Sequence, residues 1–82
     1  MPDSYFVYAI SSLTQNYIYI GITDNLDRRI NQHQSGYNRT TKPYRPFKLI
    51  YFEETTDRFQ AREMEKYFKS SAGRAELRQL NS

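Results

Sequence analysis

The sequence predicts an α+β fold in which a small three-stranded antiparallel sheet is flanked by helices in the order β-β-α-β-α-α. Two observations lead to it. Aromatic, β-branched segments occur first as an adjacent pair and then once more, and amphipathic segments with helix-capping residues follow them. With 82 residues, we expect one domain spanning residues 1–82. Cysteine is absent, so neither a disulfide nor a thiolate metal site can compensate for the small core.

The first two strands are predicted over residues 5–10 and 17–22, and the third over residues 47–52. In the first pair, apolar side chains occupy both faces. This pattern is typical of strands that are covered on both sides, or on one side with an aromatic cleft on the other.

The turn between the first two strands determines which residues face each other. If it closes a symmetric hairpin centred between Leu13 and Thr14, Tyr8 lies opposite Tyr19 and both hydroxyls share one face of the sheet. Gly21 stands two residues after Tyr19, on the same face. Because glycine has no side chain, we expect an open spot beside the hydroxyls.

A helix is predicted directly after the second strand, over residues 24–33. Thr23 or Asp24 would cap its N-terminus, and Ser35-Gly36 would end it. An acidic residue in the first turn complements the helix dipole.

This helix carries two neighbouring arginines, and its periodicity separates them. Counting 100° per residue from the first apolar position, Arg29 and His33 fall within about 60° of the apolar stripe, whereas Arg28 lies about 200° away. A guanidinium and an imidazole aimed at the open spot, beside a phenol, suit an anionic, phosphate-like ligand. The alternative is that Arg29 snorkels and pairs with a carboxylate, Asp24 or Glu65.

The second half of the chain is predicted to contain a surface loop over residues 37–46, the third strand and two helices. Asp57-Arg58-Phe59-Gln60 has the spacing of a capping box and would open a helix over about residues 58–70. A last short helix would cover residues 72–80. The expected core-facing residues are Ala61, Met64, Tyr67 and Phe68 in the first of these helices and Ala75, Leu77 and Leu80 in the second.

The net charge is +3, and much of the basic charge is concentrated in one window. No acidic residue occurs between Arg28 and Phe52, so one face should be distinctly positive. Basic and aromatic side chains that alternate in this way are typical of nucleic-acid contacts, although a solvated basic loop has the same composition. The predicted nucleic-acid-binding residues are Arg28, Arg39, Lys42, Tyr44, Arg45 and Lys48.

Hydrolysis of a phosphodiester needs stabilisation of charge on the phosphoryl oxygens, which a divalent cation held by a carboxylate can supply. Glu63 and Glu65 border the apolar stripe of their helix on opposite edges, so periodicity does not choose between them. Each could instead form a surface ion pair, Glu63 with Lys66 or Glu65 with Lys69. His33 could act as an acid, a base or a phosphate ligand, or be structural.

The ordered set of motifs resembles the GIY-YIG nuclease superfamily, which is named for two short strand motifs near the N-terminus. The second motif is intact as Tyr19-Ile20-Gly21, whereas the first, Phe6-Val7-Tyr8, keeps only its tyrosine. The resemblance continues through residues 21–33, 44–51 and 61–69. Within the superfamily, the sequence most resembles small stand-alone members that are similar to the N-terminal nuclease domain of the UvrC repair protein. These members are often called excinuclease-C-like hypothetical proteins.

This resemblance implies a divalent-metal-dependent endonuclease that hydrolyses DNA phosphodiester bonds, with a role in DNA repair or recombination and Mg²⁺ or Mn²⁺ as the cofactor. The superfamily's arginine falls on Arg29, eight residues after the motif glycine, and its metal-binding glutamate falls on Glu65. A motif tyrosine, Tyr8 or Tyr19, would activate or position water. His33 matches an auxiliary catalytic position.

Two positions depart from the family pattern. Ile22 stands where several repair members carry a lysine, and only Asn81 could represent a late asparagine found in other members. The alternative function is therefore a non-cleaving nucleic-acid-binding module that keeps the nuclease fold. A structural adaptor for a protein partner is a third reading.

DNA is the expected partner. A targeting protein is a further expected partner, because members of known role usually carry a second domain for target choice. A monomer is the default. No apolar run approaches the roughly 20 residues of a membrane span, and Met1-Pro2-Asp3 lacks the order of a signal peptide, so we expect no membrane association and a soluble, cytoplasmic protein.

Overall fold

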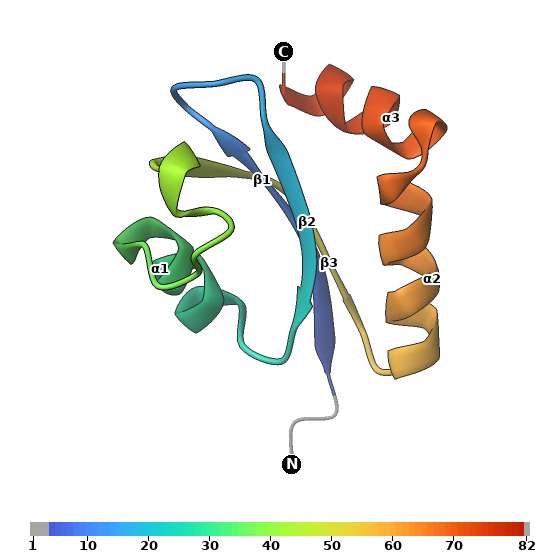
Figure 1. Ribbon diagram of the computed structural model, residues 1–82. Helices are drawn as coiled ribbons and strands as arrows, with labels where there is room; N and C mark the ends of the chain where they lie inside the picture. The colour runs from blue at the N-terminus through green and yellow to red at the C-terminus, as the bar shows by residue number, and fades with distance from the viewer. Residues whose placement is uncertain (1–3, 82) are drawn as a thin grey trace.

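The computed structural model describes residues 4–81 and contains a three-stranded antiparallel sheet with helices on both faces (Figure 1). The α+β fold class and the order of elements are confirmed. The predicted domain limits of 1 and 82 and the N-terminal Met1-Pro2-Asp3 segment lie outside the described residues. The elements are β1 (Tyr5–Ser12), β2 (Ile18–Thr23), α1 (Leu26–Ser35), the 3₁₀ helix η1 (Lys42–Tyr44), β3 (Phe47–Thr55), α2 (Arg58–Lys69) and α3 (Ser71–Asn81).

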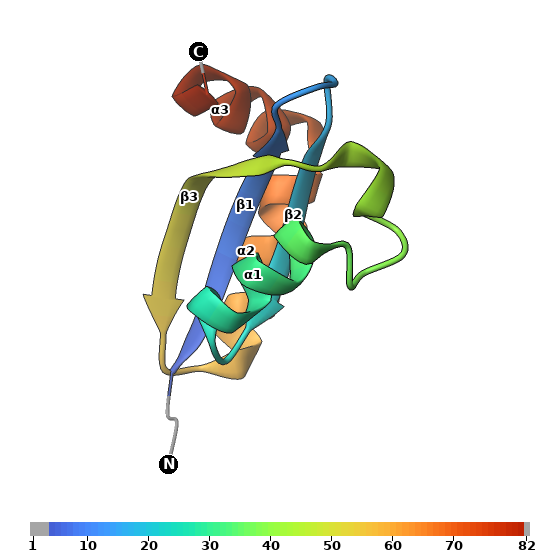
Figure 2. The same cartoon turned by 90° about the vertical axis from the view of Figure 1, so that its left-hand side faces the viewer.

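The strands lie in the order β2-β1-β3, so β1 is central and β2 and β3 form the two edges of the sheet. Figure 1 shows the sheet nearly edge-on, with α1 on one side and α2 and α3 on the other. In the turned view, α1 crosses in front of β1 and β2, and α2 lies behind them (Figure 2). The prediction that apolar strands are covered on both sides is therefore confirmed.

Alternation along β1 supplies a separate core to each face. Val7 and Ala9 point to the helical layer of α2 and α3, where they meet Ala61, Phe68 and Leu77. On the α1 side, the buried residues are Tyr8, Ile10 and Phe47.

The predicted hairpin register is wrong by two positions, although the face assignment holds. Tyr8 pairs with Gly21 and Tyr19 pairs with Ile10. The loop is centred one residue later than predicted, because Ser12 closes it: its backbone N–H donates to the carbonyl of Tyr17 at 2.9 Å. Tyr8 and Tyr19 still share one face, with ring centroids 6.2 Å apart.

Helix α1 begins one or two residues later than predicted, and its cap is Asn25. The Asn25 side chain accepts a hydrogen bond from the backbone N–H of Arg28 at 3.0 Å. Thr23 instead accepts from the backbone N–H of Asn25, and Asp24 forms an ion pair with Arg28. Gly36 ends the helix with φ 83°, as its sequence position predicts.

The edge strand β3 runs to Thr55, three residues beyond its predicted end. Glu53 and Glu54 directly follow the predicted range 47–52, and they pair through their backbones with Val7 and Phe6 of β1. On an edge strand such side chains can remain exposed, so charge does not end the pairing.

Asp57 caps α2 as predicted by accepting from the backbone N–H of Phe59, but the reciprocal half of the capping box is absent. Gln60 accepts a hydrogen bond from the hydroxyl of Thr55 instead. Of the residues predicted to face the core from α2, Tyr67 is the one for which the prediction is wrong. Its side chain is 45% exposed, and its hydroxyl donates to Glu76 of α3.

Helix α3 docks through Leu77 and Gly73, whereas Ala75 and Leu80 are exposed, contrary to the prediction. A Cβ atom at Gly73 would lie 2.1 Å from the carbonyl oxygen of Tyr67. Glycine therefore permits a backbone contact between α2 and α3 that no other residue allows. Among the described residues, no helix is long and apolar enough to span a bilayer.

Candidate functional site

An open pocket of about 950 Å³ lies across the free edge of β2, and we call it the edge pocket. Because β2 has no strand on its outer side within the described residues, side chains from both helical layers can reach around it. Helix α1 contributes Arg29, and α2 contributes Arg62 and Glu65. Strand β2 contributes Tyr19 and Gly21.

Gly21 leaves the space that Tyr8 occupies. A Cβ atom at Gly21 would lie 2.7 Å from the Tyr8 hydroxyl oxygen and 3.0 Å from the Tyr19 ring. These distances are shorter than an ordinary van der Waals contact. The open spot expected beside Gly21 is thus where the Tyr8 hydroxyl sits, just inside the pocket wall.

Behind this wall, Tyr8 begins a buried chain of hydrogen bonds. Its hydroxyl lies 2.8 Å from Nε2 of His33, and Nδ1 of His33 lies 2.9 Å from the Thr41 hydroxyl. The Thr41 hydroxyl donates to the carbonyl of Asn38, so it accepts from His33. This assigns the proton to Nδ1, and Nε2 then accepts from Tyr8.

The surroundings keep both members of this pair uncharged at neutral pH. Burial is the main cause that raises the pKa of Tyr8 to about 12. Burial, followed by the positive charge of Arg29, lowers the pKa of His33 from 6.5 to about 4. His33 is fully buried, so its imidazole is part of the packed layer behind the pocket wall.

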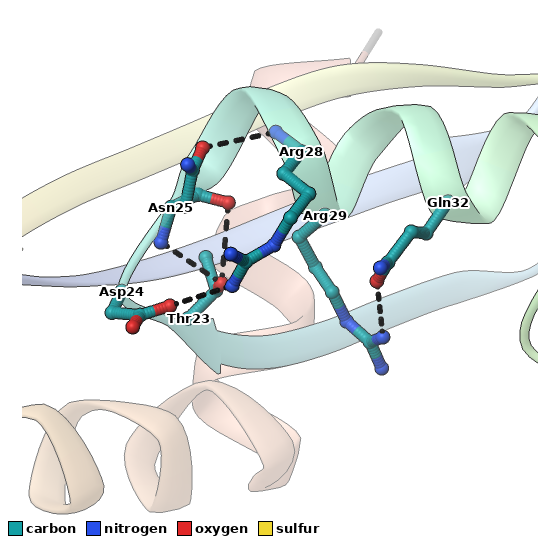
Figure 3. A network of polar contacts seen from close by, with 6 residues as sticks. All are labelled: Thr23, Asp24, Asn25, Arg28, Arg29 and Gln32. Carbon is teal, nitrogen blue, oxygen red and sulfur yellow. Dashed lines mark hydrogen bonds and ion pairs between the residues drawn. The ribbon is translucent and has the colours of Figure 1, made fainter.

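The two arginines of α1 take different directions, as their helical positions predict. Figure 3 shows Arg28 folded back toward Asp24, with which it forms an exposed ion pair at 2.9 Å, and Arg29 extending away with Gln32 beside it. Arg29 donates to the Gln32 side chain at 2.9 Å rather than to a carboxylate. Burial lowers the pKa of Arg29, but interactions with Tyr8 and Tyr19 outweigh burial and raise it.

The structure separates the two glutamates that periodicity left equivalent. Glu65 is partly buried and lines the edge pocket, whereas Glu63 is exposed and does not. Glu65 also forms the predicted alternative ion pair with Lys69, at 3.2 Å.

Glu65 is chemically suited to one kind of metal site. No group of three or more metal-ligating acidic, histidine or cysteine side chains occurs within residues 4–81, which argues against an all-protein cage. Mg²⁺ often binds through one or two carboxylates, with water and substrate phosphate oxygens as the other ligands. Two carboxylates line the wide, arginine-lined pocket: Asp24 is paired with Arg28, and Glu65 is left to serve as the carboxylate ligand in that arrangement.

Most of the predicted nucleic-acid-binding residues lie outside the edge pocket. Lys42 and Arg45 lie against Gly36 at the C-terminal end of α1, where cations complement the helix dipole. Tyr44 stacks on Tyr17 with ring centroids 3.8 Å apart. Exposed Arg39 and Lys48 lie in the loop after α1 and in β3. Of the predicted set, only Arg28 lines the edge pocket.

Sequence reasoning missed Arg58 and Arg62, which line the edge pocket from α2. Their spacing held a signal. Arg58, Arg62 and Glu65 follow each other at four and three residues, so they share one face of the helix. Arg58 also lies over the ring of Tyr5, 5.9 Å from its centroid.

The two departures from the family pattern fall in different places. Ile22 lines the edge pocket and packs against the α2-facing core, so an apolar side chain occupies that position. Asn81 is remote from it: its amide donates to the Ser11 hydroxyl near the hairpin end of β1.

Comparison with known proteins agrees with this arrangement. Residues 4–79 match the model of the GIY-YIG catalytic domain. A UPF0213 protein of Lactiplantibacillus plantarum is 37% identical over 82 residues, which cover 95% of this chain and 79% of that protein. A UPF0213 protein of Clostridium perfringens is 31% identical over 78 residues, covering 94% and 83%. The solution NMR structure of a UPF0213 protein from Bacillus halodurans aligns with a TM-score of 0.57 at 28% identity, covering 94% of this chain and 84% of that one.

Proposed function

Because this chain belongs to the GIY-YIG family, a family of nuclease type, we propose that it is a Mg²⁺- or Mn²⁺-dependent endonuclease that hydrolyses DNA phosphodiester bonds. The resemblance of its motifs to the UvrC nuclease domain supports a role in repair or recombination. The UPF0213 relatives are small proteins whose names state no activity.

One observation carries the proposal: the Tyr8–His33 hydrogen bond lies directly behind a pocket that holds Arg29 and Glu65. A proton-transfer pair, a cation for phosphate and a carboxylate are what phosphodiester hydrolysis requires.

The proton relay follows from the assigned tautomer. A water molecule beside Gly21 would give a proton to the Tyr8 oxygen while Tyr8 passes its own proton to Nε2 of His33. The hydroxide then forms a bond to phosphorus, and the bond to the leaving oxygen breaks, with solvent protonating that oxygen. Tyr8 needs no stable phenolate, which its pKa of about 12 would make rare at neutral pH.

Arg29 and Glu65 would act on the phosphate. Arg29 would contact the phosphoryl oxygens, and the anion would offset the positive charge that helps to lower the pKa of His33. Glu65 would hold Mg²⁺ or Mn²⁺, which when bound supplies charge neutralisation at those oxygens. Tyr19, on the pocket surface, is left to orient water or phosphate.

The proposal is tested by comparing Glu65→Gln with Glu63→Gln, its matched control on the same helix outside the pocket. Both variants would be assayed on plasmid, single-stranded, flap and junction DNA with Mg²⁺ or Mn²⁺. We expect Glu65→Gln to abolish cleavage while DNA affinity stays similar or rises slightly, because a negative charge near the phosphate is removed. Cleavage that survives in Glu65→Gln, or is lost equally in Glu63→Gln, would refute the assignment.

A non-cleaving DNA-binding module is the second candidate, and one observation favours it. The carboxylate of Glu65 is already neutralised by Lys69, so a cation must compete with an existing partner. In that case no DNA in the panel is cut, while salt-sensitive binding remains. A targeting protein would then be sought as the partner.

A further inference from the structure

A second cleft adjoins the edge pocket along β2, and none of the residues predicted to bind nucleic acid lies in it. It has a volume of about 240 Å³ and is lined on one side by β2 and the residue before it, Tyr17. The other side is formed by Lys69 of α2 and by Arg74 and Arg78 of α3. Tyr19 lines both the cleft and the edge pocket, so the two are neighbours on the same strand edge.

The charges in this second cleft are all of one sign. Three basic side chains and no acidic one line it. Lys69 pairs with Glu65, and Nε of Arg74 donates to the backbone carbonyl of Lys69 at 3.4 Å. Among the described residues, the side chain of Arg78 has no hydrogen-bond or ion-pair partner. Lys69 thus has a local counter-charge, but Arg74 and Arg78 form no ion pair with a described residue, so the cleft attracts an anion.

An aromatic wall completes the cleft. Tyr17 is held by stacking on Tyr44, with the two rings 9° from parallel. Tyr17 and Arg74 line the cleft together. Burial is the main cause that raises the pKa of Tyr17, and the positive charge of Arg74 partly opposes the rise. A fixed ring beside a guanidinium is a surface on which nucleotides bind with little loss of side-chain entropy.

We propose that the second cleft binds a backbone phosphate of the same DNA strand that is cut in the edge pocket. This inference rests on the proposed function. Tyr17 and Gly21 are four residues apart on an extended chain, about 13 Å, which a DNA strand covers in at most about four nucleotides because even a stacked strand rises about 3.4 Å per nucleotide. The DNA strand would therefore run along the open edge of β2, with Arg78 contacting a phosphate within about four nucleotides of the scissile bond.

The test is Arg78→Gln, with Lys66→Gln as the matched control because Lys66 is exposed on α2 and lines neither cleft. Binding of a fluorescent dithymidylate and of a longer oligothymidylate would be measured by anisotropy, in EDTA, across a salt series. For the longer strand we expect Arg78→Gln to reduce the slope of log K against log salt by about 0.7 and the affinity by about 3- to 10-fold. Arg78→Gln should bind the dithymidylate as tightly as the wild-type protein does. Lys66→Gln should bind both oligonucleotides as the wild-type protein does.

Equal slopes for Arg78→Gln and wild type on the longer strand, or an equal loss on the dithymidylate, would overturn the subsite. Arg78→Glu is the second variant and should roughly double the loss. Because Arg78 is exposed, both variants should keep the wild-type melting temperature. Cleavage is measured separately on the wild-type protein. A reduced salt slope in Arg78→Gln without cleavage by wild type would support the phosphate subsite and refute the proposed endonuclease. Cleavage by wild type without a change of slope in Arg78→Gln would support the endonuclease and refute the subsite.

Discussion

The pKa of His33 predicts that the protein loses stability in mildly acidic solution. In the folded protein, His33 is buried, donates to Thr41 and accepts from Tyr8, and its pKa is lowered from 6.5 to about 4. The unfolded chain takes up a proton near pH 6.5, whereas the folded chain does not until near pH 4. The stabilisation is therefore complete above pH 6.5 and disappears as the pH falls toward 4.

Linkage gives the magnitude. A pKa of 6.5 in the unfolded state and about 4 in the folded state lowers the free energy of unfolding by about 2 kcal/mol between pH 8 and pH 5, and by about 3 kcal/mol at pH 4. For a chain of this size, 2 kcal/mol corresponds to a decrease of about 8–16 °C in melting temperature. His33 is the only histidine in the sequence, and carboxylates titrate mainly below pH 5, so the interval from 8 to 5 isolates it.

The assay is urea denaturation at several pH values for wild type and His33→Gln, whose amide can replace both hydrogen bonds without titrating. The wild-type free energy should fall across the interval and that of His33→Gln should stay nearly level. The ring nitrogen shifts of His33 measured by NMR report its pKa and tautomer even if the variant does not fold. Parallel curves for the two proteins, or an imidazole that titrates near 6.5, would refute the reasoning.

Three further predictions concern the site and its support. Gly21→Ala should destabilise the protein by about 1–3 kcal/mol in urea denaturation, because its Cβ would meet the Tyr8 hydroxyl at 2.7 Å. The same clash should separate Tyr8 from His33 and abolish plasmid nicking. Unchanged nicking would contradict the proton relay. Gly73→Ala should cost about 3 kcal/mol or more in urea denaturation, because the clash is with backbone atoms of Tyr67, and a loss below about 1 kcal/mol would mean that α3 shifts freely. Arg29→Gln should lower the cleavage rate at saturating DNA, whereas Arg28→Gln should mainly lower affinity, because Arg28 is folded back onto Asp24 and Arg29 is not paired with a carboxylate. An equal loss of rate in both variants would contradict this division.

The sequence was sufficient for the fold and for the inward arginine, for physical reasons. Aromatic strands with two apolar faces indicated a sheet covered on both sides, and helical periodicity alone separated Arg29 from Arg28. The prediction that Tyr8 and Tyr19 share one face of the sheet held, because side chains alternate between the faces with a period of two and a register error of two residues leaves each on the same face. The register itself was not predictable, because Ser12 and Tyr17 close a loop whose centre the sequence does not mark.

The part of the site that sequence reasoning lacked comes from the sheet order. Periodicity could not choose between Glu63 and Glu65, because the choice depends on which edge of α2 lies beside β2. Because α2 lies beside β2, Arg62 also reaches the edge pocket. Lys48 lies on β3, at the other edge of the sheet, and is outside the pocket. A run of charge along the sequence located basic residues, but only the packed layers determine which of them meet.

The uncapped outer side of β2 has a further consequence for the protein's behaviour in solution. A free strand edge can pair with the same edge of another copy, and charged side chains are a common means of preventing such aggregation. Arg29, Arg62 and Glu65 surround this edge, so they would act as gatekeepers as well as ligands. Substitutions that neutralise Arg29 or Arg62 would remove positive charge, and with it mutual repulsion between copies, together with binding capacity. Light scattering should therefore accompany every activity measurement on such variants, because a loss of activity through self-association would otherwise resemble a loss of catalysis.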